Sequence, residues 1–600
     1  MTRILLMNIM VAVLTACGGH ANVQCEQDSN CDLSGGGRCL TASTGNQWCA
    51  YPDPGCSSGY RYSDQDIGDG LGGMCAAAGQ TFTLTVNIGG DGSGTVTSSP
   101  DGLQCSGATC TGVFSAGAQV QLAEIASSGA FLGWSGDCVG FGSCSVTLDQ
   151  DRTVGALFGM KGEGLWVVQV GGPGYERAYS IATTSDGNLI AVGEFEDTVM
   201  IGMQSITSHG STDIYVAKLD STNGNVLWAK AIGGANAESA TAVAVDDMDN
   251  IYIAGTYAGS VDFGSGNVLN GFGVNDALLV KLTPTGDYVW AHGIGGTDYD
   301  YGDAVAVSGG TVVLSARYRS SMTVNSTTYS VQGQFDVFLA AFSTTDGAFK
   351  WAKSIGGTGI DIGFGVAVDA DGNVISTGRF ANSVDFGGGA VSSGTTSKGY
   401  IAKYNGTNGA YLFAKSVGGA ASGVTQVNAM TVDGSKNLIV VGVFTGTIDF
   451  GNGSPIMATN ANGDIYVAKY SPAGALVWVK SFAASGGNPT PTSVNTNSAG
   501  DVAFTGNFCG SITFGGPILS SASMCPSNDV FAVRLAGADG AHINSIRAGG
   551  QGDEYGQGVT QTADGRFFVS GRFQGFADFA GQALTCAGND DAFILGLAPL

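Results

Sequence analysis

Residues 351–380 read WAKSIGGTGIDIGFGVAVDADGNVISTGRF, and this stretch decides the fold class. It holds a short apolar run beginning at Trp351, a glycine pair at Gly356 and Gly357, and an alternating run that ends at Val368. An Asp-Gly turn then leads into a second apolar run. Short alternating runs separated by turns rich in glycine and asparagine are typical of β-strands and not of helices. The stretch therefore predicts antiparallel strands joined by tight turns.

The same order of features recurs along the chain from residue 164 onward. An apolar landmark, aromatic in all but one unit, returns at intervals of 61 to 65 residues, and in most units a glycine pair follows it. A fixed period of this size indicates a repeat architecture. Each unit contains four short strand-like runs, and four antiparallel strands per repeat predict the blade of a β-propeller. The landmarks are Trp166, Trp228, Trp290, Trp351, Phe413 and Trp478, with the degenerate Ile543 as the seventh.

The two ends of the array complement each other. The array opens on a lone fourth strand at 165–170 and ends on a third strand at 591–597. Together these strands would complete one blade, so we expect an all-β, seven-bladed β-propeller with 3+1 strand closure. Such a closure protects the first and last sheet edges from pairing with another chain.

Two resemblances follow from these motifs. The unit resembles the seven-bladed propeller repeat of large exported bacterial proteins, including the sequences AKSIGG at 352–357 and DFGGG at 385–389. That family has no single activity, so the resemblance implies a fold and not a function. The run LDSTNGNVLW at 219–228 resembles the tryptophan-docking repeat of quinone-dependent dehydrogenases. This second likeness implies packing between blades and not a cofactor site, because the docked rings are buried.

The N-terminus carries an export signal. One basic residue, Arg3, precedes a short apolar run from Ile4 to Leu14, and Leu14-Thr15-Ala16-Cys17 follows. This resembles the lipobox of bacterial lipoproteins, which implies a signal peptide at 1–16 and a lipid bilayer anchor through acylated Cys17. The glycines after Cys17 imply, by family analogy, the outer membrane. An ordinary secretory signal with an incidental cysteine is the alternative.

The cysteines agree with export. Besides Cys17, one cluster of six and one of four fall in short segments, and three more cysteines lie near the C-terminus. Even clusters in an exported chain predict disulfides. Zinc is the competing interpretation, but close C-x-x-C pairs and a nearby histidine pair are missing from the sequence. We expect Cys586 to be unpaired. The disulfide candidates are Cys25, Cys31, Cys39, Cys49, Cys56, Cys75, Cys105, Cys110, Cys138, Cys144, Cys509 and Cys525.

Changes in composition predict three regions after the signal: a cysteine-rich disulfide segment at 17–79, a module at 80–159 and the propeller at 160–600. The middle module, with FLGWSGDC at 131–138 and CSVTL at 144–148, resembles the divergent bacterial surface repeat related to the internalin B-repeats. That resemblance implies a small β-grasp-like fold. It would make Cys105 with Cys110, and Cys138 with Cys144, short local disulfides, although three connectivities are open.

Motifs for chemistry are sparse. Asp369, Asp371 and Asn373 could hold calcium, yet they lie between two strands, where Asp-Gly and Asn-Gly are favoured turn residues. We therefore interpret them as a turn. Residues 55–59 match the G-x-S-x-G hydrolase motif by letter but lie among cysteines, and a chance match is the better account. The four histidines, at 20, 209, 292 and 542, are isolated in sequence, so no metal-ligand pair is evident.

Charge and domain order bound the function. The net charge of −25 disfavours nucleic acid as a partner, because binding phosphate backbones depends on Lys and Arg. No cofactor is expected. The long connections before each third strand vary in sequence, and we expect them to carry recognition. The preferred hypothesis is a non-catalytic cell-envelope lipoprotein that binds or scaffolds an unknown protein or glycan through its propeller. The alternatives are a periplasmic or surface enzyme of quinoprotein or carbohydrate-active type, and a purely structural envelope component.

Overall fold

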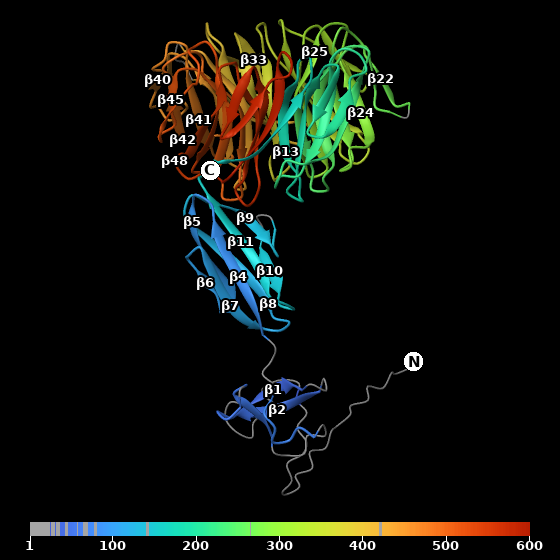
Figure 1. Cartoon of the computed structure of the whole chain (residues 1–600). Coiled ribbons are helices and arrows are strands. Elements are labelled where there is room, and N and C mark those ends of the chain that lie inside the picture. The colour runs from blue at the N-terminus through green and yellow to red at the C-terminus, as the bar shows by residue number, and fades with distance from the viewer. Residues whose placement is uncertain are drawn as a thin grey trace, which may run out of the picture.

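The computed structural model describes residues 25, 31, 37–42, 46–56, 58–63, 70–76, 81–139, 143–264, 266–418 and 423–599. All regular secondary structure in these ranges is β-strand, which confirms the predicted all-β class. The search for membrane-crossing helices finds no candidate in the described part of the chain. Cys17 and the rest of the expected export signal lie outside these residues. Figure 1 shows three groups of strands that follow one another along the chain.

The first group is a small three-stranded sheet with little apolar core. Trp48, Ala50 and Tyr62 are its main buried apolar residues. Disulfides join Cys25 to Cys39, Cys31 to Cys49 and Cys56 to Cys75. Because so small a core supplies little stability, the disulfides must contribute much of it. The strands are β1 (Arg38–Thr41), β2 (Gln47–Pro52) and β3 (Tyr60–Tyr62).

The second group consists of two four-stranded sheets over residues 81–159. The sheet orders are β10-β8-β5-β6 and β7-β4-β11-β9, with β11 parallel to β4. Leu84, Trp134 and Phe158 belong to one core. This differs from the expected β-grasp-like arrangement, in which a helix would cross the sheet, because nearly every segment alternates and is extended. The strands are β4 (Thr81–Gly89), β5 (Ser93–Ser99), β6 (Gln104–Cys105), β7 (Thr109–Ser115), β8 (Gln119–Ser128), β9 (Ala130–Gly136), β10 (Cys144–Thr147) and β11 (Arg152–Gly159).

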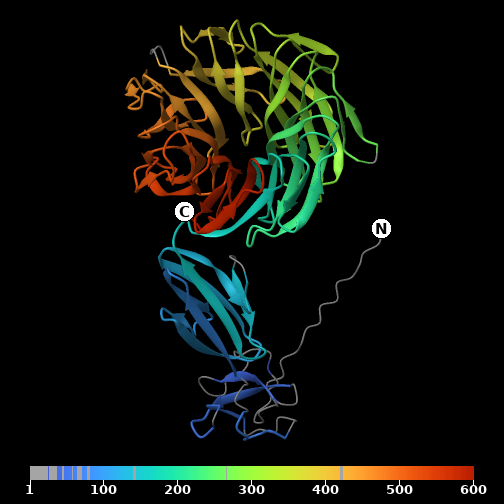
Figure 2. The same cartoon turned by 45° about the horizontal axis from the view of Figure 1, so that its top comes forward.

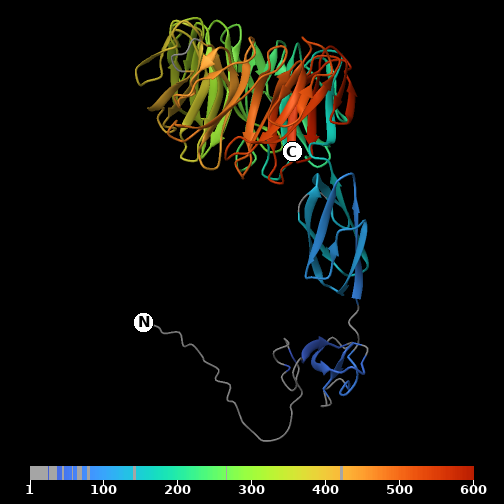
Figure 3. The same cartoon turned by 90° about the vertical axis from the view of Figure 1, so that its left-hand side faces the viewer.

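The third group contains the repeats, and each sheet is built on four antiparallel strands, which follow the chain in order in all sheets but the one that joins its two ends. In three sheets a short hairpin extends the outer strand to give six strands. Figure 2 shows these sheets arranged around a central opening, as blades of a β-propeller, and Figure 3 shows the ring edge-on.

The innermost strands, which open each sheet, are β13 (Arg177–Thr183), β19 (Glu238–Val245), β25 (Asp300–Ser308), β31 (Ile362–Val368), β37 (Thr425–Val432), β43 (Thr490–Thr496) and β49 (Tyr555–Gln561). The second strands are β14 (Leu189–Phe195), β20 (Ile251–Tyr257), β26 (Thr311–Tyr318), β32 (Val374–Phe380), β38 (Leu438–Phe444), β44 (Val502–Phe508) and β50 (Phe567–Phe573). The third strands are β17 (Asp213–Leu219), β23 (Asp276–Leu282), β29 (Asp336–Ser343), β35 (Lys398–Tyr404), β41 (Asp464–Tyr470), β47 (Asp529–Leu535) and β53 (Asp591–Leu597). The outer strands are β18 (Val226–Gly234), β24 (Tyr288–Ile294), β30 (Phe349–Ile355), β36 (Tyr411–Val417), β42 (Leu476–Phe482), β48 (His542–Gly550) and β12 (Gly164–Gly171).

One sheet combines strands from both ends of the array. β12 pairs antiparallel with β53, so that Trp166 lies opposite Gly596 and Val170 lies opposite Ala592. β53 in turn pairs with β50, and β50 with β49. The first strand of the array, β12, is therefore the outer strand of the sheet whose inner three strands are β49, β50 and β53.

The long connections between second and third strands, which we expected to carry recognition, contain short hairpins. The first strand of each hairpin contacts the end of the outer strand of the preceding sheet, as where β21 pairs with β18 and β51 pairs with β48. Part of each connection therefore joins neighbouring sheets. The hairpins are β15 (Thr198–Ile201) with β16 (Gln204–Thr207), β21 (Ser260–Asp262) with β22 (Val268–Asn270), β27 (Ser321–Val324) with β28 (Thr327–Ser330), β33 (Ser383–Asp385) with β34 (Ala390–Ser392), β39 (Thr447–Ile448) with β40 (Ile456–Met457), β45 (Ser511–Thr513) with β46 (Ile518–Ser520), and β51 (Phe576–Phe579) with β52 (Gln582–Thr585).

Candidate binding site

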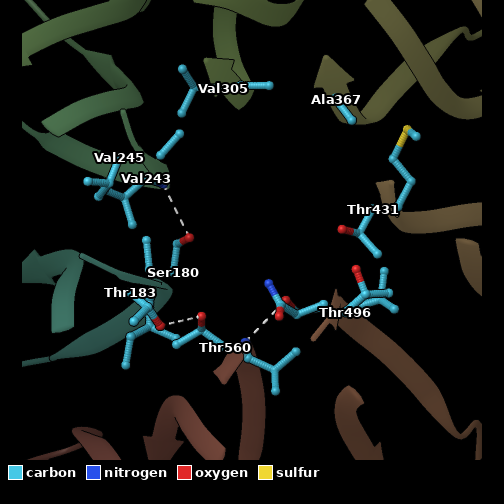
Figure 4. A pocket seen from close by; sticks show the side chains of 18 of the residues that line it. Ser180, Thr183, Val243, Val245, Val305, Ala367, Thr431, Thr496 and Thr560 are labelled. Atoms are coloured by element: carbon cyan, nitrogen blue, oxygen red, sulfur yellow. Dashed lines mark hydrogen bonds between the residues drawn. The ribbon is translucent and has the colours of Figure 1, made fainter. Parts of the chain in front are cut away.

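The innermost strands surround a cavity of about 520 Å³ at the centre of the ring. Its wall has two different halves. Three neighbouring strands, β19, β25 and β31, line it only with valine and alanine, such as Val243, Val305 and Ala367. The strands on the other side add hydroxyl and amide side chains, among them Thr496 and Thr560. Figure 4 shows Val243, Val305 and Ala367 on one side and Thr496 and Thr560 on the other.

Gln561 is a polar lining residue whose side-chain amide is buried without a partner. Only 8% of the residue is exposed, and neither Nε2 nor Oε1 has a hydrogen-bond partner within the described chain. A buried amide without partners costs free energy unless a ligand or water satisfies it. Nearby, the hydroxyls of Thr183 and Thr560 share a hydrogen bond of 2.8 Å. The Gln561 amide therefore lies covered behind the wall, and the half-buried Asn495 supplies the polar half with an amide that can both donate and accept.

The described residues that line the cavity are all uncharged: they are aliphatic, methionine, serine, threonine, asparagine or glutamine. General acid–base catalysis uses titratable side chains placed at the substrate, and this wall supplies none of them. The arrangement fits recognition of a neutral molecule that has an apolar face and a hydroxyl-bearing face.

The calcium candidates form a turn between β31 and β32. Asp369 Oδ1 accepts hydrogen bonds from the backbone N–H groups of Asp371 and Asn373, and Lys403 Nζ lies 2.8 Å from Asp369 Oδ2. Burial works to raise the pKa of Asp369, but the hydrogen bonds from Lys403 and Asn373 outweigh it and lower the pKa. Both oxygens of Asp369 are thus engaged by the protein, as the turn interpretation requires. The Asp371 carboxylate points elsewhere, to Lys436 Nζ at 2.7 Å.

The cysteine candidates form six disulfides in the described residues. In addition to the three in the small sheet, Cys105 pairs with Cys110, Cys138 with Cys144 and Cys509 with Cys525. Several disulfides are typical of a protein that folds outside the cytoplasm. Cys586 is unpaired.

The other motifs do not come together as a catalytic site. Cys25, Cys31 and Cys49 are close enough to hold a metal ion, but all three are in disulfides, which leaves no thiolate ligand. Cys56 of the G-x-S-x-G match is likewise bonded to Cys75, and the motif's serine lies outside the described residues.

The histidines in the described chain have separate partners. His209 Nδ1 lies 2.7 Å from Asp213 Oδ2, and a ring nitrogen of His292 lies 2.7 Å from the Gly347 carbonyl oxygen. His542 contacts Ser545. His20 lies outside the described residues.

Sequence reasoning missed a set of buried acids beside the glycine pairs. Each lies four residues after the second glycine, and its carboxylate accepts that glycine's backbone N–H, as Glu238 does from Gly234 and Asp300 from Gly296. The signal was present as Gly-Gly followed by an acidic residue at this spacing. The acids are Glu176, Glu238, Asp300, Asp361 and Glu554.

Comparisons with known proteins find only distant similarities. No family model matches the chain. An uncharacterized WD repeat-containing protein of Acanthamoeba polyphaga mimivirus is 24% identical over a match of 156 residues, with a coverage of 21% of this chain and 11% of that protein. The chain thus spans only a small part of that curated relative.

The similar solved structures are distant. BamB from Moraxella catarrhalis is 12% identical with a TM-score of 0.30, over 70% of this chain and 99% of that one. The WD40 β-propeller domain of Doa1 is 7% identical with a TM-score of 0.34, over 73% and 96%. Quinohemoprotein alcohol dehydrogenase from Comamonas testosteroni is 11% identical with a TM-score of 0.33, over 72% and 76%. At these scores none of them bears on what the chain binds.

Proposed function

We propose that the chain is a cell-envelope lipoprotein whose seven-bladed propeller binds a neutral glycan at its central cavity and performs no catalysis. Cys17 would carry the lipid that anchors the protein in the outer membrane. The segments at 17–79 and 80–159 would act as a disulfide-stabilised stalk and spacer. The pairing of β12 with β53 supports the 3+1 closure, and the six disulfides support a location outside the cytoplasm.

The two-sided neutral wall of the cavity carries this proposal. A sugar ring has apolar C–H faces and a rim of hydroxyls, and its hydroxyls both donate and accept hydrogen bonds. The valine and alanine half can pack against the C–H face, while the Asn495 amide and the threonine hydroxyls can bind the rim. A charged ligand would find no opposite charge on this wall, and burying an uncompensated charge is costly.

The test is isothermal titration of the full mature chain with neutral disaccharides, cellobiose and N-acetylchitobiose. Asn495→Leu removes a half-buried side-chain amide from the polar half of the wall and should weaken binding about tenfold or more, since an unpaired ligand hydroxyl costs ~1–3 kcal/mol. Val305→Thr should weaken it by placing a hydroxyl in the apolar half. Thr323→Val changes an exposed residue of β27, which is not among the residues that line the cavity, and should leave binding unchanged.

The same titration separates this proposal from the enzyme alternative. Binding of a pyrroloquinoline quinone cofactor with calcium, in place of the disaccharides, would favour a quinoprotein and overturn the proposal. Hydrolysis of a disaccharide would favour a carbohydrate-active enzyme. Lipidation is tested separately by palmitate labelling, which Cys17→Ala should abolish.

A further inference from the structure

Pairs of buried carboxylates lie where neighbouring sheets of the ring meet. In each pair, one acid begins a third strand and the other begins or directly precedes the first strand of the next sheet. In three such pairs, which we call the junction pairs, one oxygen on each carboxylate is buried without a hydrogen bond of good geometry among the described residues. The backbone N–H groups of Ala258 and Arg319 still lie close enough to Glu238 and Asp300 to lower the pKa of each, whereas Glu554 has no such additional neighbour within the described chain. All six side chains are at most 1% exposed. The junction pairs are Asp213 with Glu238, Asp276 with Asp300, and Asp529 with Glu554.

The pair of Asp529 and Glu554 shows the arrangement most clearly. Glu554 Oε2 accepts the Gly550 backbone N–H at 2.7 Å, and Asp529 Oδ2 accepts from Arg547 Nη1 at 2.8 Å and from the Ala522 backbone N–H at 2.9 Å. Glu554 Oε1 and Asp529 Oδ1 remain without partners. Both carboxylates flank Gly549: a Cβ there would lie 2.7 Å from Asp529 Cγ and 2.7 Å from Glu554 Oε2.

The pair of Asp276 and Asp300 repeats this pattern. A Cβ on Gly295 would lie 1.9 Å from Asp276 Oδ1 and 3.0 Å from Asp300 Oδ2, so these carboxylates also flank one glycine. Asp276 Oδ2 accepts the Phe272 backbone N–H at 2.7 Å. In the remaining pair, Asp213 Oδ2 accepts the His209 backbone N–H at 2.9 Å.

Two carboxylates buried side by side cannot both ionise at low cost. As anions they offer only acceptors, and their charges repel at low dielectric. One proton turns one carboxylate into a donor toward the other, which removes the repulsion and leaves one shared negative charge. We propose that each junction pair holds one proton in the folded protein, and that these protons fasten neighbouring sheets of the ring to each other.

The pKa values of the acids in the junction pairs agree with this geometry. Burial raises the pKa of Glu554 to about 7, and the charge of Asp529 adds to the effect. Asp553 also raises it, while Arg547 on β48 acts in the opposite direction. An acid whose folded pKa lies above its ordinary 4.5 favours folding most at low pH, and this contribution falls as the pH rises from about 4.5 to about 7.

The other two pairs have similar surroundings. Burial raises the pKa of Asp300 to about 7, with the charges of Asp276 and Asp298 adding to it; Arg319 Nε lies 3.9 Å from Asp298. Burial raises the pKa of Glu238 to about 7 as well. The charge of Asp213 raises the pKa of Glu238 further, and His209 lowers it.

At one junction between sheets, neither of the two equivalent positions holds an acidic residue. Lys398 begins β35 where the other third strands begin with aspartate, and Thr425 takes the place of the second acid. Lys398 Nζ donates to the Gly423 carbonyl oxygen at 2.9 Å, and Thr425 Oγ1 donates to the Val417 carbonyl oxygen at 2.6 Å. Where the carboxylate pair is missing, side chains that carry their own protons take over the bonding. This is the substitution expected if the pairs need a proton.

The test is the Glu554→Gln variant of the full mature chain, followed by thermal unfolding between about pH 5 and about pH 9. The glutamine oxygen can still accept from Gly550, and its amide group can donate to Asp529 Oδ1 without a titratable proton. We expect its melting temperature to exceed that of the unmodified protein by a few degrees above pH 7, with little or no gain at pH 5. A melting temperature below that of the unmodified protein at every pH would overturn the proposal.

Asp361→Asn is the matched control at an equivalent position. Both Asp361 oxygens already accept hydrogen bonds from backbone N–H groups, those of Ala381 and Gly357. The NH2 group of an asparagine at this position would therefore face an N–H donor where an acceptor is needed. This variant should lose stability at every pH. A measurement without any variant is the infrared carbonyl band of protonated carboxyl groups at pH 6, which should disappear by about pH 9. Absence of the band at pH 6, or a calcium-dependent rise in melting temperature that Glu554→Gln removes, would contradict proton sharing.

Discussion

The indole N–H of Trp351 on β30 donates a hydrogen bond of 2.8 Å to the carbonyl oxygen of Gly406, in the turn that precedes the outer strand of the next sheet. Trp166 makes the same contact with Ser221 at 3.1 Å, and Trp478 makes it with Gly537 at 3.2 Å. The ring also covers a turn glycine: a Cβ on Gly409 would lie 2.8 Å from the Trp351 ring. The landmark tryptophans therefore join neighbouring sheets, as the likeness to the tryptophan-docking repeat implied.

Trp351→Phe should lower the free energy of unfolding by ~1–3 kcal/mol, because it keeps an aromatic ring but leaves the buried Gly406 carbonyl without its donor. Trp290→Phe is the matched control. Trp290 Nε1 is buried without a partner among the described residues. Its replacement should be neutral or slightly stabilising. Urea unfolding of both variants measures the difference, and equal losses would contradict the role of the hydrogen bond.

The strand order and the turns could be predicted because they depend on residues close in sequence. The physical reason for the glycine pairs could not be predicted from the sequence. A Cβ on Gly356 would lie 2.2 Å from Asp336 Oδ1, and one on Gly357 would lie 1.8 Å from the Ser383 carbonyl oxygen. These contacts join different strands and different sheets, so the local pattern shows only that glycine recurs.

The cavity was also beyond the sequence. The innermost strands alternate only weakly, and runs such as VAV at 305–307 and TVD at 431–433 differ little in pattern. Which of their side chains face the centre depends on how the sheets are arranged around the ring. The recurring Asp-Phe-Gly at 262–264 and 449–451 indicates a structural turn within the long connections. The pairing of the hairpins with the preceding sheet could not be predicted, because it involves backbone groups that many sequences can supply.

Asp369→Asn should destabilise the protein by ~3 kcal/mol near neutral pH, because it leaves the buried Lys403 ammonium without its counter-ion. The pKa of Asp369 is lowered in the folded state, so the stability it adds is present above its ordinary pKa of 3.8 and is lost as the pH falls below that value. Thermal unfolding as a function of pH should therefore show the two proteins converging in acid.

Asp371→Asn controls for the turn itself. Asp371 forms a solvent-exposed ion pair with Lys436, so its loss should change stability by less than about 1 kcal/mol. Calcium and a chelator should leave the melting temperature of the unmodified protein unchanged. A calcium-dependent rise that Asp369→Asn abolishes would instead support the metal site.

Replacing Cys509 and Cys525 together by serine should lower the free energy of unfolding by ~3 kcal/mol, as expected for a cross-link between residues 16 positions apart. Cys586→Ser is the control, because Cys586 is unpaired and serine keeps a donor for Asp591 Oδ1. Burial raises the pKa of the Cys586 thiol to about 11, so little thiolate exists near neutral pH in the folded protein. A thiol reagent should therefore react slowly with the native chain and rapidly after unfolding without reductant, since the thiolate is the nucleophile. Equal rates in both states would contradict the burial of Cys586, and no reactive thiol after unfolding would show that Cys586 is paired.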